Sequence, residues 1–139
     1  MGKQLIASSN LNNLAEQIFN SNLEVGWWNE EETTKLREEY RQSNKFSKDS
    51  ALLIASKIAL IHSEVSEALE GMRKGLHDDH LSHRSGLEVE LADTIIRIFD
   101  LAGAIDLDLD GAIREKYAYN MERADHKMSN RLAEGGKTI

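Results

Sequence analysis

The stretch that decides the fold runs from Ser50 to Met72 and reads SALLIASKIALIHSEVSEALEGM. Its apolar residues recur in steps of three and four, which is the period of one face of an α-helix. They are Ile54, Ile58, Ile61, Val65, Ala68 and Met72. A second stretch, from about Gly86 to Ile105, has the same period. Apolar seams of this kind are typical of helices packed in a bundle, so the sequence predicts two consecutive long core helices.

The rest of the chain also has helical signals. Capping residues and spacing predict three further helices: one from Ser9 or Asn10 to near Gly26, an exposed polar one from Glu30 to Gln42, and one from Asp108 or Asp110 to about Asn130. No segment alternates as a half-buried strand does, and the chain contains no proline. We therefore expect an all-α bundle of four to five helices, formed by residues 1–139 as a single domain.

Composition excludes several classes of function. The 139 residues include no cysteine, which excludes a disulfide framework, a thiolate zinc site and a cysteine nucleophile. A net charge of −7 argues against a protein that grips nucleic acid through its phosphates. No apolar run is long enough to span a membrane, and the N-terminus lacks the apolar core of a secretory signal. We expect a cytoplasmic protein that contacts anionic substrates through metal ions and a few placed cations.

Two pairs of acids fall where the apolar seams predict buried faces. Glu64 and Glu67 lie on the first long helix, and Glu90 and Asp93 lie on the second. Each pair is three residues apart, so both carboxylates point to one side of a helix. Burying unpaired carboxylates is costly, and only Lys57 and Arg97 are nearby cations. Oxygen ligands favour hard ions, so these four residues predict a Mg²⁺ site that also accepts Mn²⁺.

Several of these patterns have other interpretations. Acidic pairs three residues apart are also ordinary features of solvated helices. A di-iron centre requires histidine three residues after a glutamate, whereas Glu67 and Asp93 occupy those places. The residues His77, His80 and His83 could hold zinc, but no clear fourth ligand accompanies them, and a solvated or subunit-contact loop is the simpler interpretation. The terminal GGKT of residues 135–138 lacks the spacing and the following helix of a phosphate-binding loop.

Three blocks resemble the MazG-type nucleotide pyrophosphohydrolases. Residues 62–70, HSEVSEALE, and residues 88–93, EVELAD, resemble the EExxE and ExxD signature of that family, with Ser63 in place of the first glutamate. Residues 115–123, EKYAYNMER, resemble its Lys-x-x-x-Asn-x-x-Arg segment, whose following His-Gly is matched only loosely by His126-Lys127. Gly26-Trp27-Trp28 is also similar. The resemblance covers about residues 10–127.

The resemblance implies an activity and a set of roles. It implies an enzyme that cleaves nucleoside triphosphates between the α- and β-phosphates, giving the monophosphate and pyrophosphate. Glu64, Glu67, Glu90 and Asp93 would hold two or more Mg²⁺ or Mn²⁺ ions, which polarise the α-phosphate and activate a bound water. Glu64 or Glu67 would also orient that water in catalysis. Lys116, Asn120 and Arg123 would bind the phosphates from one helical face.

The resemblance further implies a homodimer, or a homotetramer built as a dimer of dimers, in a bacterial or phage-infected cytoplasm. Similar phage-type enzymes favour dGTP among deoxynucleotides, and we expect the same here. Trp27 and Trp28 could stack on the base, although the alternative is that at least one of them anchors the core. Two other functions stay open: a non-catalytic helical oligomer that binds nucleotide or metal as a regulator, and a dUTPase-like or phosphoribosyl-ATP pyrophosphatase-like activity of the same superfamily.

Overall fold

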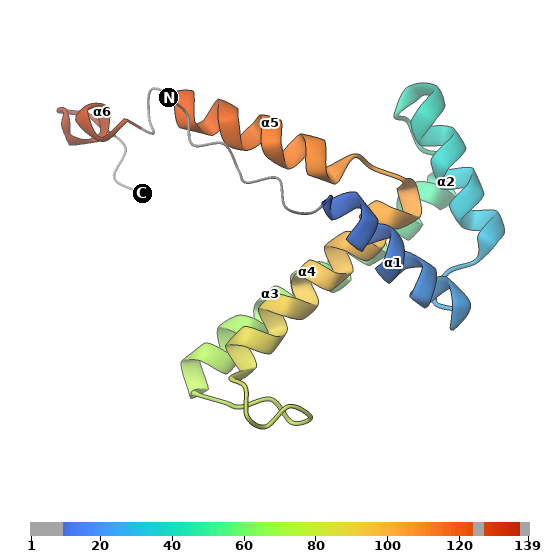
Figure 1. Cartoon of the computed structure of the whole chain (residues 1–139), viewed down its shortest axis with the longest axis horizontal. Coiled ribbons are helices and arrows are strands. Elements are labelled where there is room, and N and C mark those ends of the chain that lie inside the picture. The colour runs from blue at the N-terminus through green and yellow to red at the C-terminus, as the bar shows by residue number, and fades with distance from the viewer. Residues whose placement is uncertain (1–9, 124–126, 137–139) are drawn as a thin grey trace. The chain divides into compact units, whose positions relative to one another are not determined.

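The computed structural model describes residues 10–123 and 127–136, and these are helical with short connections (Figure 1). The helices are α1 (Leu11–Glu24), α2 (Glu30–Ser43), α3 (Lys48–Lys74), α4 (Gly86–Ile105), α5 (Leu109–Glu122) and α6 (Met128–Leu132). This confirms the predicted all-α class, with one short helix more than expected. Residues 12–107 form one compact unit, and the described residues on either side of them belong to another. None of the helices in the described ranges has both the length and the hydropathy needed to cross a membrane.

Local sequence explains where the long helices begin and end. The side chain of Ser47 accepts a hydrogen bond from the backbone N–H of Ser50 at the start of α3, and Ser85 caps α4 in the same way through Glu88. At the other end of α3, Gly75 adopts a left-handed conformation, with φ of 60°, which glycine takes without strain. α1 begins at Leu11, beside Asn10, while Ser9 lies outside the described residues.

Helices α3 and α4 run side by side as an antiparallel hairpin, which Figure 1 shows as the long green and yellow pair. A pair of glycines permits their close approach. A Cβ atom on Gly71 would lie 3.2 Å from the backbone nitrogen of Leu87, and one on Gly86 would lie 3.3 Å from the carbonyl oxygen of Leu76. Gly71 therefore lies within α3 as a contact point with the start of α4.

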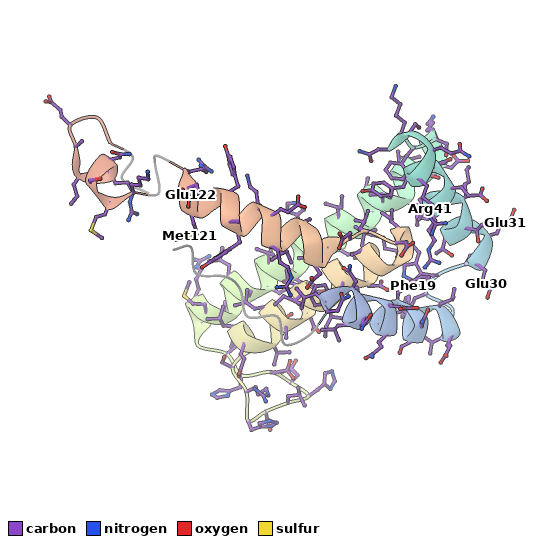
Figure 2. All side chains as sticks on the ribbon, turned by 45° about the horizontal axis from the view of Figure 1, so that its top comes forward. Phe19, Glu30, Glu31, Arg41, Met121 and Glu122 are labelled. Atoms are coloured by element: carbon purple, nitrogen blue, oxygen red, sulfur yellow. The ribbon has the colours of Figure 1, made fainter. Side chains whose placement is uncertain are left out.

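The hydrophobic core of residues 12–107 lies where α1, α2 and α4 meet. Its fully or nearly buried members are Phe19 (labelled in Figure 2), Trp28, Leu36, Leu101, Ala104 and Ile105. The Phe19 and Trp28 rings meet edge to face with centroids 6.1 Å apart. The guanidinium carbon of Arg37 lies 5.0 Å from the centroid of the Phe19 ring, and Arg37 donates hydrogen bonds to the carbonyl oxygens of Gly103 and Ala104 in the last turn of α4. Helix α2 is otherwise polar, and Glu30 and Glu31 (Figure 2) occupy its first turn.

The C-terminal helices belong to the second unit and differ from the prediction. A single helix to about Asn130 is wrong, because α5 ends at Glu122 and Arg123 has an extended backbone, with φ of −61° and ψ of 139°. No residue of α5 is buried. Helices of this length gain most of their stability from tertiary packing, and the described residues give α5 no buried contact that would extend it beyond Glu122. At its start, Asp108 caps α5 through the N–H of Gly111, as one of the two predicted caps.

Candidate functional site

Three of the four predicted metal ligands meet between α3 and α4. Glu64, Glu90 and Asp93 each offer a carboxylate oxygen, and these three oxygens lie within 4.8 Å of one another. Glu64 is buried, with 7% of its surface exposed, and the other two are half-buried. The antiparallel pairing of the helices explains the meeting, because it brings the acidic turn of α3 opposite the acidic turn of α4. Glu67 lines the same groove but is not one of the three converging side chains.

The electrostatics of this cluster act most strongly on Glu90. Burial is the largest of several causes that together raise the pKa of Glu90 to about 7; the others are a hydrogen bond to the Glu64 carboxyl and the charges of Glu67, Glu64 and Asp93. The pKa of Asp93 is also raised, first by burial and then by the charge of Glu64. A raised pKa of a carboxyl group means that nearby cations do not fully offset the negative charge of its ionised form. A divalent cation between them would supply that compensation.

One side-chain cation already reaches the cluster. The Nε of Arg97 donates a hydrogen bond to Oε1 of Glu64 over 2.6 Å. Arg97 lies one turn after Asp93 on α4, and its charge partly offsets the effect of burial on the pKa of Asp93. Lys57, the other cation expected near the acids, instead lies with its Nζ 4.0 Å from the centroid of the Trp28 ring. Of the two cations that the sequence places near the acids, Arg97 is therefore the one that offsets their negative charge.

A groove of about 430 Å³ opens over the acids, and the connection from α3 to α4 forms its other wall. We call it the acidic groove; besides the four predicted ligands it is lined by His77, Asp78 and His80. Backbone N–H groups of Leu81 and His80 donate to Asp78 and lower its pKa, so it stays ionised beside the cluster. The connection itself is held by pairing of His77 with Ser85. His83 is not one of the lining residues.

Sequence reasoning missed Asp78 because it belongs to no periodic pattern. The signal in the sequence was the position of Asp78 in the short connection that joins the two helices carrying the predicted metal ligands. Asp100 was missed as well, although its place in α4 seven residues after Asp93 was a signal. Two helical turns separate these aspartates, so they share one face of α4.

The two tryptophans have different environments. Trp28 is a core residue, 5% exposed, and its Nε1 donates a hydrogen bond over 2.9 Å to Oδ1 of Asp100. Trp27 is 72% exposed and lines a second hollow of about 440 Å³. We call this hollow the Trp27 pocket; Leu60 and Ile96 give it apolar walls, and Lys57, Arg97 and Asp100 give it charged ones. Asp93 lines both the acidic groove and the Trp27 pocket.

The predicted phosphate-binding residues belong to the other unit. Lys116 and Asn120 are one turn apart on α5, but Arg123 follows the end of the helix and does not continue their face. The Lys116 Nζ lies 4.7 Å from the centroid of the Tyr119 ring. Oδ1 of Asn120 is shielded from solvent and accepts no hydrogen bond from the described part of the chain. Their role toward a phosphate stays a prediction, and His126 of the same block lies outside the described residues.

Comparisons with protein-family models, with curated proteins and with solved structures give no match to this chain. The oxygen-rich donor set of the site suits a hard divalent cation, and its neighbouring pocket offers an aromatic face and apolar walls.

Proposed function

We propose that this chain is a metal-dependent nucleoside triphosphate pyrophosphohydrolase of the MazG type. The observation that carries the proposal is the convergence of Glu64, Glu90 and Asp93, whose carboxylate oxygens lie within 4.8 Å of one another. Three oxygen donors at that spacing fit Mg²⁺ or Mn²⁺, with Glu67 at the edge of the same groove for a second ion. When bound, these ions would polarise the phosphate chain and lower the pKa of a coordinated water.

The protein's own residues would hold the substrate around that centre. Arg97 sits between the acidic groove and the Trp27 pocket and would offer a guanidinium to the phosphate chain. Glu67 is free of hydrogen bonds to described side chains and would orient the attacking water, as would Glu64 once it is released from Arg97. Lys116, Asn120 and Arg123 would bind the outer phosphates. The base would lie against Trp27, because Trp28 is buried in the core and presents no face to solvent.

The test is product analysis with a panel of ribo- and deoxynucleoside triphosphates and either Mg²⁺ or Mn²⁺. We expect a nucleoside monophosphate and pyrophosphate in equal amounts, with a deoxyguanosine substrate among the best. Glu90→Gln should lower kcat/KM by about 100-fold or more, because a ligand and its charge are lost together. Glu88→Gln is the matched control, since Glu88 is two residues away on α4 and pairs on the surface with Arg84 over 2.7 Å.

Two results would contradict the proposal. Release of inorganic phosphate in place of pyrophosphate would assign cleavage to another bond. Absence of turnover by micromolar protein, together with Mn²⁺ binding at the acids, would favour the non-catalytic regulatory oligomer. A preference for dUTP or phosphoribosyl-ATP would keep the enzyme class and change the substrate.

We further propose that the active form is a homodimer or a dimer of dimers in the cytoplasm. The support is an apolar surface on α3 and α4 that nothing in the described chain covers. It consists of Ile58, Val65, Leu69, Met72, Leu87, Leu91, Ile95 and Ile98, each between 36% and 54% exposed. Contiguous exposed apolar residues of this kind mark interaction surfaces.

A further inference from the structure

The connection between α3 and α4 carries two histidines that have no part in the reaction proposed above. His77 and His80 line the acidic groove, whereas His83 of the same connection does not. Every other polar side chain that lines this groove is a carboxylate. Among the described lining residues, the imidazoles of His77 and His80 are therefore the side chains that can donate a hydrogen bond from nitrogen.

Backbone hydrogen bonds hold these two histidines in a closed loop. His77 pairs with Ser85 as an isolated antiparallel bridge, and the N–H of Asp78 donates to the carbonyl oxygen of Arg84 over 3.1 Å. The carboxylate of Asp78 in turn accepts from the backbone N–H of His80 over 2.8 Å. A loop that is ordered before a ligand arrives loses little conformational freedom on binding it.

The two imidazole rings make no hydrogen bond within the described part of the chain. His80 uses its backbone N–H toward Asp78, and His77 pairs with Ser85 through its backbone. Both residues are exposed. An imidazole has at least one N–H donor whether it is neutral or protonated, so both rings can donate to an anion without a change of ionisation.

The histidines also lie on the side of the site where a leaving group would extend. Asp93 lines both the Trp27 pocket and the acidic groove. With the base against Trp27 and the α-phosphate beside Asp93, the remaining phosphates would enter the acidic groove. The wall formed by the connection acts on this aspartate, because the charge of Asp78, after burial and the charge of Glu64, contributes to the raised pKa of Asp93.

We propose that His77 and His80 form a subsite for the pyrophosphate end of the substrate, donating hydrogen bonds to its terminal phosphate oxygens. This inference rests on the proposed function, and it adds an element that lies outside the sequence blocks of the resemblance. Hydrogen bonds to a charged phosphate are roughly twice as strong as those between neutral groups. When bound, divalent ions would offset the charge of the carboxylates, so that an anion can enter the groove.

The test is calorimetric binding of pyrophosphate and of dGMP, dAMP, dCMP and dTMP, each with saturating Mg²⁺. We expect His77→Phe and His80→Phe each to weaken pyrophosphate binding about tenfold, which is the effect of one hydrogen bond to a charged group. The monophosphates should bind these variants as they bind the wild type, because they have no phosphate beyond Asp93. His80→Asn keeps an N–H donor and should recover part of the lost affinity.

Two controls separate a phosphate subsite from other roles of the histidines. His83→Phe is the matched control, since His83 belongs to the same connection and does not line the groove. Imidazole is also a common metal ligand, so Mn²⁺ binding is measured without pyrophosphate. Mn²⁺ affinity should be the same in the wild type and in both variants. A lower affinity in His77→Phe or His80→Phe would overturn the subsite and assign that histidine to the metal.

The remaining outcomes separate this inference from the proposed function. Pyrophosphate that does not bind the wild type, or that binds the wild type and both variants equally, would overturn the subsite while triphosphate hydrolysis could still be observed. Pyrophosphate binding that depends on His77 and His80, without any triphosphate hydrolysis, would sustain the subsite and refute the enzyme.

Discussion

At the scale of single residues, Glu90 is the group whose ionisation links metal to stability. Its pKa is about 7 in the folded chain, against an ordinary value of 4.5. Between these two values the folded state binds a proton that the unfolded state has lost. Stability of the metal-free protein should therefore fall as pH rises from about 4.5 to 7. Above pH 7 the ionised carboxylate adds to the charge of its neighbours, and a bound cation should restore the stability lost.

Thermal unfolding of metal-free protein across pH 5 to 8 measures this effect. Glu90→Gln should melt higher than the wild type at pH 7.5 without metal, and should lose the increase that Mn²⁺ gives the wild type. Glu88→Gln should follow the wild type in both respects. The opposite result would be a melting temperature that rises with pH in the metal-free wild type and does not vary with pH in Glu90→Gln. It would show that Glu90 does not have the raised pKa.

Arg97 is the second residue whose role is open to measurement. In the metal-free protein it is the cation bound to the buried Glu64, over 2.6 Å. Arg97→Met should lower the free energy of unfolding by about 1–2 kcal/mol, because a buried carboxylate loses a charged hydrogen bond. Saturating Mn²⁺ should recover most of that loss, since the metal supplies Glu64 with another cationic partner. Arg84→Met, which breaks only the exposed pair with Glu88, should change stability little in either condition.

At the scale of elements, close approach of helices depends on glycines that the periodic pattern did not single out. A Cβ on Gly103 would lie 2.6 Å from the carbonyl oxygen of Ala15 and 2.7 Å from Cβ of Phe19. Backbone atoms cannot move aside as flexible side chains do. Gly103→Ala should therefore lower the free energy of unfolding by about 1–3 kcal/mol, although alanine is the better helix former by about 1 kcal/mol. Chemical denaturation measures it, and a stabilised Gly103→Ala protein would mean that α1 and α4 are further apart.

The presence of the helices could be predicted from this sequence because apolar spacing and capping residues indicate the same segments. The two long helices have both signals, and α3 and α4 begin and end within a few residues of their predicted bounds. The helix after Asp108 has weak apolar periodicity, and its predicted end was wrong for that reason. Local signals fix an element where packing supports it, and α5 buries nothing.

The acidic site could be predicted in part. Spacing showed that each pair of carboxylates shares a helical face, and the apolar neighbours of Glu64 indicated its burial. Which acids converge depends on the register between α3 and α4, which the contact of Gly71 with Gly86 permits and the sequence pattern does not reveal. The partners of Trp28 show the same limit. Asp100 follows it by 72 positions, and only tertiary structure joins them.

At the scale of the whole molecule, the distribution of residues around α3 and α4 argues for self-association. Val65 directly follows Glu64, and Leu91 directly follows Glu90. Successive residues of a helix differ by about 100° in direction, so Val65 and Leu91 point to other sides of their helices than Glu64 and Glu90 do. A second copy could cover the apolar surface and leave both acidic grooves open. Two helices from each copy would then form a four-helix bundle.

Sedimentation of the wild type at micromolar concentration should therefore give a dimer or a tetramer. Leu69→Lys combined with Ile95→Lys should shift the population to monomer by at least about tenfold in dissociation constant, because two charges would be buried at the interface. Leu52→Lys is the matched control, since Leu52 is 60% exposed and lies about 120° around α3 from Ile58, away from the apolar surface. A monomeric wild type would refute the assembly. An oligomer that tolerates both lysines would place the contact elsewhere, because no interface over α3 and α4 could bury those charges unpaired.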